Sequence, residues 1–211
     1  MTIQMTTISF LLLSCPAMSS DQKPEPPGSA PVYSTPEAVY AASVAASEKS
    51  DARAAVHCIA PSAHADMAAY LAFHALIARR LSGKQPKLFA DVLAVLDKHG
   101  LTEDATKMIS RTDLKAAVKS LSTLIKKPTE FAIEMSIAQH EFAAKMGSGK
   151  KPKVTHKLAN LKIDGNKATA TVVMTLNEQL FEQPMAFVKV GEGWKMLPDF
   201  SSQPMNLRPK K

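Results

Sequence analysis

The chain has 211 residues, of which 45% are hydrophobic and 21% charged. It is therefore long enough to bury a core of its own and too apolar to be disordered throughout. Its formal net charge is +7. Such a positive charge can serve binding to nucleic acid, attraction to an anionic membrane surface, or solubility alone. The lysine clusters are not interleaved with aromatic residues, so bases have nothing to stack on, and we do not expect nucleic acid as a partner.

The chain opens with a short apolar run at residues 8–13, after which the sequence becomes polar and rich in proline. This order is typical of an export signal, and the run is far shorter than the ~20 apolar residues that span a bilayer. Residues 12–15, Leu-Leu-Ser-Cys, resemble the lipobox of bacterial lipoproteins. That resemblance implies a membrane-anchored protein that carries its lipid on Cys15. The competing expectations are ordinary cleavage near residues 17–19, which gives a periplasmic protein, and a cytoplasmic protein with a disordered start.

We divide the chain into four parts that differ in composition. They are an export or lipoprotein signal (1–19), a proline-rich disordered tether (20–33), a single α+β domain (34–199) and a basic tail (200–211). Within the domain, residues 34–146 are expected to be helical and residues 153–198 to form a β meander.

The first helix is predicted where a threonine, a proline and a glutamate follow one another. Thr35 is a good N-cap, Pro36 suits the first helical position, and Glu37 favours the positive end of the helix dipole. This helix should run to about Ser47. A short second helix is expected over residues 51–59.

Apolar residues recur at helical spacing through the rest of the N-terminal part. The predicted helices are residues 62–81, 86–99, 102–110, 112–124 and 130–146. We expect Pro128 to break the chain between the last two.

The hydrophobic period then changes to two, which is typical of strands. The predicted strands are residues 157–163, 168–176, 181–190 and 194–197. The Asp-Gly-Asn sequence at 164–166 predicts a tight hairpin, and Pro184 implies a bulge or an edge in the third strand. The expected fold class is therefore α+β, with a helix-rich N-terminal part packed on a C-terminal four-stranded antiparallel meander.

Two segments, residues 35–61 and the closing hairpin at 186–196, resemble the nuclear-transport-factor-2-like and cystatin-like superfamily. More narrowly, they resemble small exported bacterial proteins with that layout. The resemblance implies a helix pair in the concave side of a curved antiparallel sheet, and it leaves residues 86–146 as an insertion or as evidence against the assignment. That superfamily contains enzymes, ligand binders and association modules, so the fold alone does not choose a function.

Several motifs that would indicate catalysis or metal binding are incomplete. His140 and Glu141 begin an HExxH zinc helix, but Ala144 stands where the second histidine is needed. Residues 147–150 resemble a phosphate-binding loop, but Lys151 stands where a serine or threonine should follow. A further set lacks the paired spacing of zinc ligands: His57, Cys58, His64 and His74. We expect no catalytic residues, no metal and no cofactor.

Three glutamates, Glu130, Glu134 and Glu141, follow helical spacing in the last predicted helix. Paired carboxylates can perform acid–base chemistry when they are buried. Because these three lie beside or opposite the apolar stripe, we interpret them as a solvated face.

Our leading hypothesis is a non-enzymatic, envelope-associated domain that binds a partner or a small ligand on the concave sheet face. Six residues are expected to line that pocket: Tyr40, His57, Tyr70, His74, Met174 and Trp194. A lipid anchor would be its only link to the membrane. The alternatives are a small enzyme of the same fold, an isomerase or a hydrolase, and a homodimeric assembly module that uses the open face of its sheet.

Overall fold

The computed structural model describes residues 31–81, 87–104, 106–107, 109, 113–146, 154–176 and 179–200. The predicted leader with Cys15, most of the tether and nearly all of the basic tail lie outside these residues. Most of the expected helix at 102–110 can be described, and it contains turns rather than a helix. None of the described helices is both long and apolar enough to cross a membrane.

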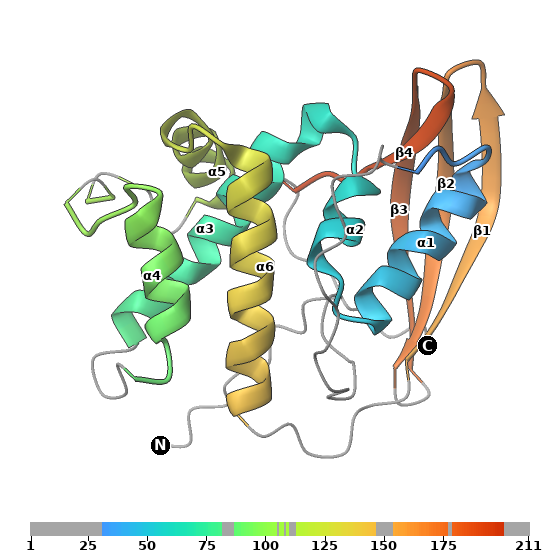
Figure 1. Ribbon diagram of the computed structural model, residues 1–211. Helices are drawn as coiled ribbons and strands as arrows, with labels where there is room; N and C mark the ends of the chain where they lie inside the picture. Colours follow the sequence, from blue (N-terminus) through green and yellow to red (C-terminus); the bar gives the residue numbers. More distant parts are fainter. Residues whose placement is uncertain are drawn as a thin grey trace.

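The described chain is α+β, as predicted, with its helices first and its strands last (Figure 1). The helices are α1 (Pro36–Glu48), α2 (Ala52–His57), the 3₁₀ helix η1 (Pro61–Ala63), α3 (His64–Leu81), α4 (Ala90–Lys98), α5 (Leu114–Leu124) and α6 (Pro128–Lys145). The strands are β1 (Val154–Asp164), β2 (Lys167–Leu176), β3 (Gln179–Val190) and β4 (Gly193–Leu197).

Side-chain caps fix where several helices begin. The hydroxyl of Thr35 accepts a hydrogen bond from the Ala38 N–H at 3.1 Å, which is the predicted cap of α1. The carboxylate of Asp51 caps α2 and that of Asp113 caps α5 in the same way. Pro128 occupies the first turn of α6 rather than merely interrupting the chain, because a proline needs no N–H partner there.

Helix α1 is followed by a residue in the left-handed region, Ser50, whose φ is +58°. The Asp51 N–H bonds back to the Ala46 carbonyl at 2.9 Å, and the Ser50 N–H bonds to the Ser47 carbonyl at 3.2 Å. This is the hydrogen-bond pattern of a Schellman motif, in which glycine usually takes the left-handed position.

The four strands form one antiparallel sheet in the order β1-β2-β3-β4, which is the predicted meander. Gly165 turns the first hairpin with a φ of +56°, as the Asp-Gly-Asn sequence predicts. The register shift of the sheet lies in β1, between Ala159 and Lys162, where Asn160 has a φ of +54°. Pro184 was predicted to mark a bulge or an edge. It pairs with Thr171 in unbroken register, so there is no bulge at this position. It lies beyond the part of β3 that pairs with β4, so β3 is an edge strand at this position.

The β4 edge of the sheet is covered by two segments from the start of the domain. The Met196 N–H donates to the Cys58 carbonyl and the Ala60 N–H to the Met196 carbonyl, each at 2.8 Å. The Trp194 N–H donates to the Tyr33 carbonyl, also at 2.8 Å. These bonds occupy backbone groups that an edge strand otherwise leaves exposed.

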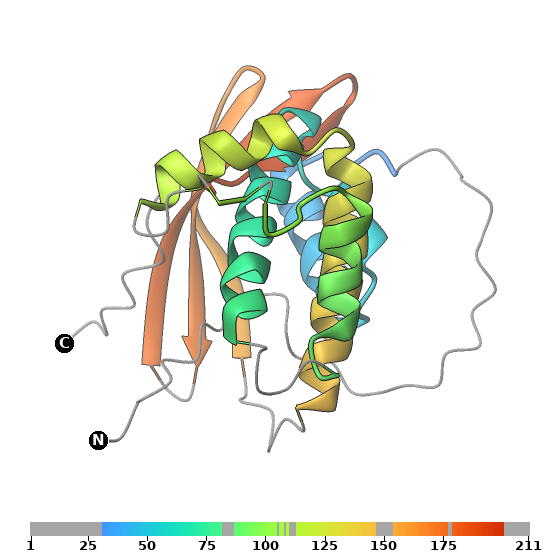
Figure 2. The same cartoon turned by 90° about the vertical axis from the view of Figure 1, so that its left-hand side faces the viewer.

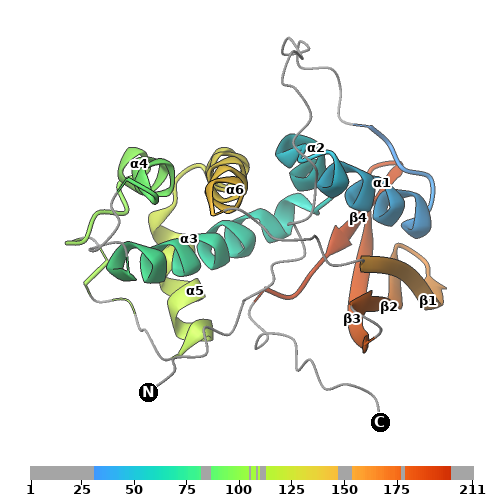
Figure 3. The same cartoon turned by 90° about the horizontal axis from the view of Figure 1, so that it is seen from below.

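The described apolar side chains form two main cores. The first, the helical core, lies among α3, α4, α5 and α6 and contains Phe131, Leu96 and Leu121. The second, the sheet core, lies between α1 and one face of the sheet and contains Val39, Phe187 and Trp194. Figure 3 shows the two groups of elements side by side, and Figure 2 shows α4 beside α6 in the helical group. Ile59, which follows α2, packs against both cores and so joins them.

Candidate functional site

The inner face of the sheet is the face that α1 covers. Towards the end of β2 and the start of β3 it carries a small apolar group, Val172, Met174 and Phe181, which we call the inner-face cluster. Tyr40 of α1 packs against this cluster and also against the sheet core. Tyr40 therefore marks the place where the covered part of the sheet meets the inner-face cluster.

The Tyr40 hydroxyl is buried and has no hydrogen-bond partner among the described residues. Burial raises the pKa of this phenol, so it stays protonated at neutral pH and remains a hydrogen-bond donor. Leaving a buried hydroxyl without a partner costs about 1–3 kcal/mol, so such a group calls for an explanation.

A second buried polar atom of this kind belongs to His156 on β1. Its register partner on β2 is Met174, and directly paired residues of antiparallel strands share a face. The Nδ1 atom of His156 is buried and has no partner among the described residues. Burial lowers the pKa of His156, while the nearby charge of Glu48 at the end of α1 raises it. The inner-face cluster is thus bordered by a neutral imidazole and a phenol.

Three of the six residues predicted to line a pocket lie at this face. They are Tyr40, Met174 and Trp194, and the structure brings them together through the sheet core and the inner-face cluster. Met174 and Trp194 are buried, so they act as apolar floor and packing rather than as exposed binding groups.

The other three predicted pocket residues lie elsewhere. Tyr70 and His74 are neighbours on α3, with ring centroids 4.5 Å apart, and Tyr70 packs against the helical core. His57 is the last residue of α2, and its carbonyl accepts a hydrogen bond from the Lys195 ammonium at 2.7 Å. The predicted six-residue lining is therefore divided among three places in the fold.

Two of the four residues considered as metal ligands, Cys58 and His64, form hydrogen bonds within the fold. Cys58 is fully buried, burial raises the pKa of its thiol, and its Sγ–H faces the Tyr33 hydroxyl at 3.7 Å. His64 donates through Nε2 to the Ile59 carbonyl at 3.1 Å, so its Nδ1 accepts from the Thr129 hydroxyl at 2.8 Å. The Nδ1 bond thereby ties the start of α3 to the start of α6, and the Nε2 bond ties it to the segment that follows α2.

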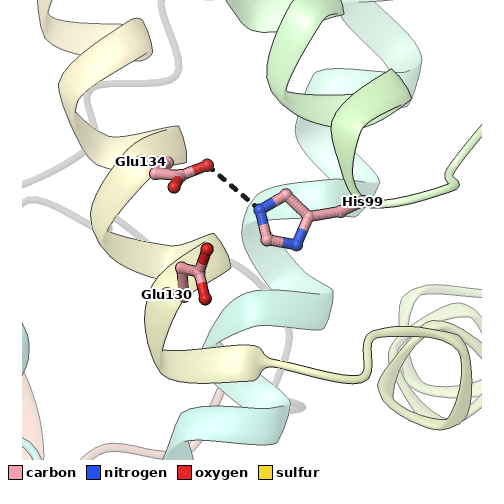
Figure 4. A group of neighbouring side chains, drawn as sticks. All are labelled: His99, Glu130 and Glu134. Carbon is pink, nitrogen blue, oxygen red and sulfur yellow. Dashed lines mark hydrogen bonds and ion pairs between the residues drawn. The ribbon is translucent and has the colours of Figure 1, made fainter.

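A different group of possible metal ligands lies between α4 and α6 (Figure 4). His99, Glu130 and Glu134 each offer one ligand atom, and these atoms all lie within 4.8 Å of one another. Within the group, Nε2 of His99 is 3.1 Å from Oε2 of Glu134. Among the described residues no other group of three such side chains converges in this way.

Two lysines surround these carboxylates. Lys98 forms ion pairs with Glu134 and, at 3.6 Å, with Glu130, while Lys127 contacts Glu130 at 3.0 Å. Hydrogen bonding from Lys98 lowers the pKa of Glu134, and hydrogen bonding from Lys127 lowers that of Glu130. Both carboxylates are therefore ionised at neutral pH.

Sequence reasoning missed His156 and His99. His156 precedes the first predicted strand, so its place on the inner face followed only from the register with Met174. His99 ends a predicted helix beside Gly100. Histidine is favoured at the negative C-terminal end of a helix, so its presence there did not indicate a site. Its proximity to Glu134, 35 positions later, depends on how α4 packs on α6 and leaves no local signal.

No protein-family model, curated protein or solved structure matches this chain.

Proposed function

We propose that this chain is a non-enzymatic, envelope-associated domain that binds a small, largely apolar ligand on the inner face of its sheet. The observation that carries the proposal is the pair of buried polar atoms, the Tyr40 hydroxyl and the His156 Nδ1, beside an apolar cluster. Small-molecule sites in proteins combine an apolar lining with a few well-placed polar groups. A ligand that hydrogen bonds to either atom would remove the penalty of leaving it without a partner.

The chemistry of these two groups sets the expected ligand class. Burial keeps the phenol of Tyr40 protonated and disfavours a charged imidazole at His156. Neither group then offers a full positive charge to an anion. The expected ligand has an apolar body and an uncharged hydroxyl, carbonyl or amine that hydrogen bonds to Tyr40 or His156.

The position of α1 across one face of an antiparallel sheet supports this proposal, because it is the layout that the resemblance to the nuclear-transport-factor-2-like superfamily implies. Export by a leader at residues 1–19, with or without a lipid on Cys15, remains part of the proposal. In that setting the tether would hold the binding domain away from the membrane.

Native mass spectrometry of the protein, purified without denaturation, tests the proposal first. We expect a retained adduct of discrete mass that is lost on unfolding and that is reduced in Tyr40→Phe and His156→Gln. Tyr33→Phe is the matched control, since the hydroxyl of Tyr33 contacts Cys58 instead. An adduct that is equally abundant in all four proteins would place the ligand elsewhere, and a bare mass of two chains would favour the homodimeric module.

A small enzyme of the same fold is the second candidate, favoured by one observation. The two titratable groups at the inner face have pKa values displaced in opposite directions, Tyr40 upward and His156 downward, as acid and base partners often do. An enzyme would convert its bound molecule, so the adduct mass would change during incubation with the wild-type chain and stay constant with His156→Gln. A constant mass in both would leave binding as the function.

A further inference from the structure

The group formed by His99, Glu130 and Glu134 lies in the helical part, away from the inner face of the sheet. We propose that these three side chains bind a divalent transition-metal ion of the zinc class between α4 and α6. The site is independent of the ligand-binding proposal, because no residue is shared between the two.

The spacing of the ligand atoms suits such an ion. Zinc sits about 2.0–2.2 Å from nitrogen and oxygen ligands in a tetrahedral site, so two ligand atoms are about 3.4 Å apart. The Nε2 of His99 and Oε2 of Glu134 are already 3.1 Å apart. Glu130 precedes Glu134 by four residues on α6 and therefore projects from the same face of the helix. Its ligand atom lies within 4.8 Å of the other two, so it would have to move closer to reach the ligand spacing.

The imidazole is held in place by its surroundings. Only 8% of the His99 side chain is exposed, and its ring lies edge-to-face on Phe131 with the centroids 5.0 Å apart. Phe131 is itself fully buried in the helical core. Ligands that project from packed helices keep their geometry better than ligands on loops. The feature that points to a metal is the convergence of this buried imidazole and two carboxylates on one place between the helices.

The lysines leave one oxygen of Glu134 to the ion but contact both oxygens of Glu130, so the ion would have to displace a lysine from Glu130. Glu134 gives Oε1 to Lys98 and turns Oε2 to His99, whereas Glu130 gives Oε1 to Lys98 and Oε2 to Lys127. Lys98 is 55% exposed, so its ammonium can move into water at little cost when a dication binds. Lys98 is thus the competitor of the metal, and its removal should favour binding.

The donor set indicates the class of metal. One imidazole nitrogen and two carboxylate oxygens suit zinc, cobalt, iron and manganese, and zinc and nickel bind such sites more tightly than manganese. Three protein ligands leave a further coordination position for water or an exchangeable ligand.

Titration of the full-length, tag-free protein after chelator treatment tests this proposal. We expect one equivalent of Zn²⁺ per chain by isothermal titration calorimetry and the visible absorption of tetrahedral cobalt when Co²⁺ is used instead. His99→Gln and Glu134→Gln should each weaken Zn²⁺ binding at least tenfold. His57→Gln, a histidine outside the group, should leave binding unchanged, and Lys98→Met should tighten it several-fold.

Wild-type affinity in Glu134→Gln, or no binding by the wild-type chain at micromolar Zn²⁺, would overturn the proposal. Circular dichroism establishes that each variant is folded. If His99→Gln fails to fold, Glu134→Gln and Lys98→Met decide the matter, because weaker binding in the first and tighter binding in the second require a metal at these carboxylates. Unchanged affinity in both would show that zinc binds elsewhere.

Discussion

The hydroxyl of Ser50 lies 2.9 Å from Nε2 of His140, although the two residues are 90 positions apart in the chain. Ser50 belongs to the turn between α1 and α2, and His140 belongs to α6. The bond therefore ties an element that covers the sheet to a helix of the helical core. The other ring nitrogen of His140, Nδ1, is buried without a partner among the described residues, so the Ser50 hydroxyl is the polar contact that the structure assigns to this ring.

Two substitutions of Ser50 distinguish the energetic effect of this hydrogen bond from that of the left-handed backbone conformation. Ser50→Ala should lower the free energy of unfolding by about 1–3 kcal/mol, because it leaves a second nitrogen of a part-buried imidazole without a partner. Ser50→Gly loses the same bond but relieves a left-handed conformation that costs a non-glycine residue about 1–2 kcal/mol. Urea denaturation should therefore show the glycine variant to be more stable than the alanine variant. Equal stability of the two variants would mean that the left-handed backbone carries no strain.

Tyr40→Phe should make the ligand-free protein more stable, not less. The substitution removes a buried hydroxyl that has no partner among the described residues and leaves the ring packed on the inner-face cluster. The expected gain is about 1 kcal/mol in the free energy of unfolding. Tyr33→Phe is the comparison, because the Tyr33 hydroxyl accepts from the Cys58 thiol and its loss should not stabilise the fold. A destabilised Tyr40→Phe would reveal a partner for this hydroxyl in the folded protein.

Stability should fall as the solution is acidified below the ordinary histidine pKa. Burial lowers the pKa of His57, His74 and His156 from 6.5 in the folded chain. The unfolded chain therefore binds protons first as the pH falls through 6.5, and the loss of stability continues until the folded histidines also titrate.

The pH dependence is measured by urea denaturation between about pH 7.5 and about pH 5.5, where carboxylates contribute little to the change. His74→Phe keeps an aromatic ring against Tyr70 and removes one titrating group, so it should flatten the dependence. A variant as sensitive to acid as the wild type would mean that His74 titrates alike in the folded and unfolded chains.

Gly193→Ala should weaken the contact between β4 and the start of the domain. A Cβ at this position would lie 3.1 Å from Cγ1 of Val32 and 3.3 Å from the backbone nitrogen of Tyr33. The backbone cannot move away without disturbing the hydrogen bond between Trp194 and Tyr33, so we expect a loss of about 1–3 kcal/mol.

Val32→Ala tests the cause of that loss. Val32 is 68% exposed, so its own truncation should cost little, but it removes one of the two close contacts with the new Cβ. The double variant should therefore be more stable than the sum of the two single changes predicts. Strict additivity would show that the new methyl group does not meet Val32.

Local signals in the sequence predicted much of the fold. The cap at Thr35 and the Asp-Gly-Asn turn after β1 each depend on residues within a few positions of one another, and both formed as predicted. The change of hydrophobic period also placed all four strands in the expected order. The predicted start of β1 was wrong, since the strand begins three residues before Lys157.

The candidate sites were harder to predict because they depend on packing between distant segments. Periodicity identified the apolar face of α3 and the cap predicted α1, but neither signal gave a reason to assign Tyr70 and Tyr40 to different cores. Glu134 was expected on a solvated face, and only the packing of α4 against α6 places the His99 ring beside it. Hydrogen bonds that lack a local motif, such as this one, cannot be read from the order of residues.

The cover on the β4 edge also constrains the order in which the protein can fold. Lys195 reaches the carbonyl of His57 across 138 residues, and the same edge joins Trp194 to Tyr33. Helix α1 is the first helix of the described chain but cannot complete its side of the sheet core until the last strand is in place. The helical core, built from α3 to α6, has all of its own helices before then. A chain that stops before β4 would thus hold all the helices of the helical core but lack Trp194 and Met196 of the sheet core, which would leave apolar residues of α1 partly exposed to a chaperone.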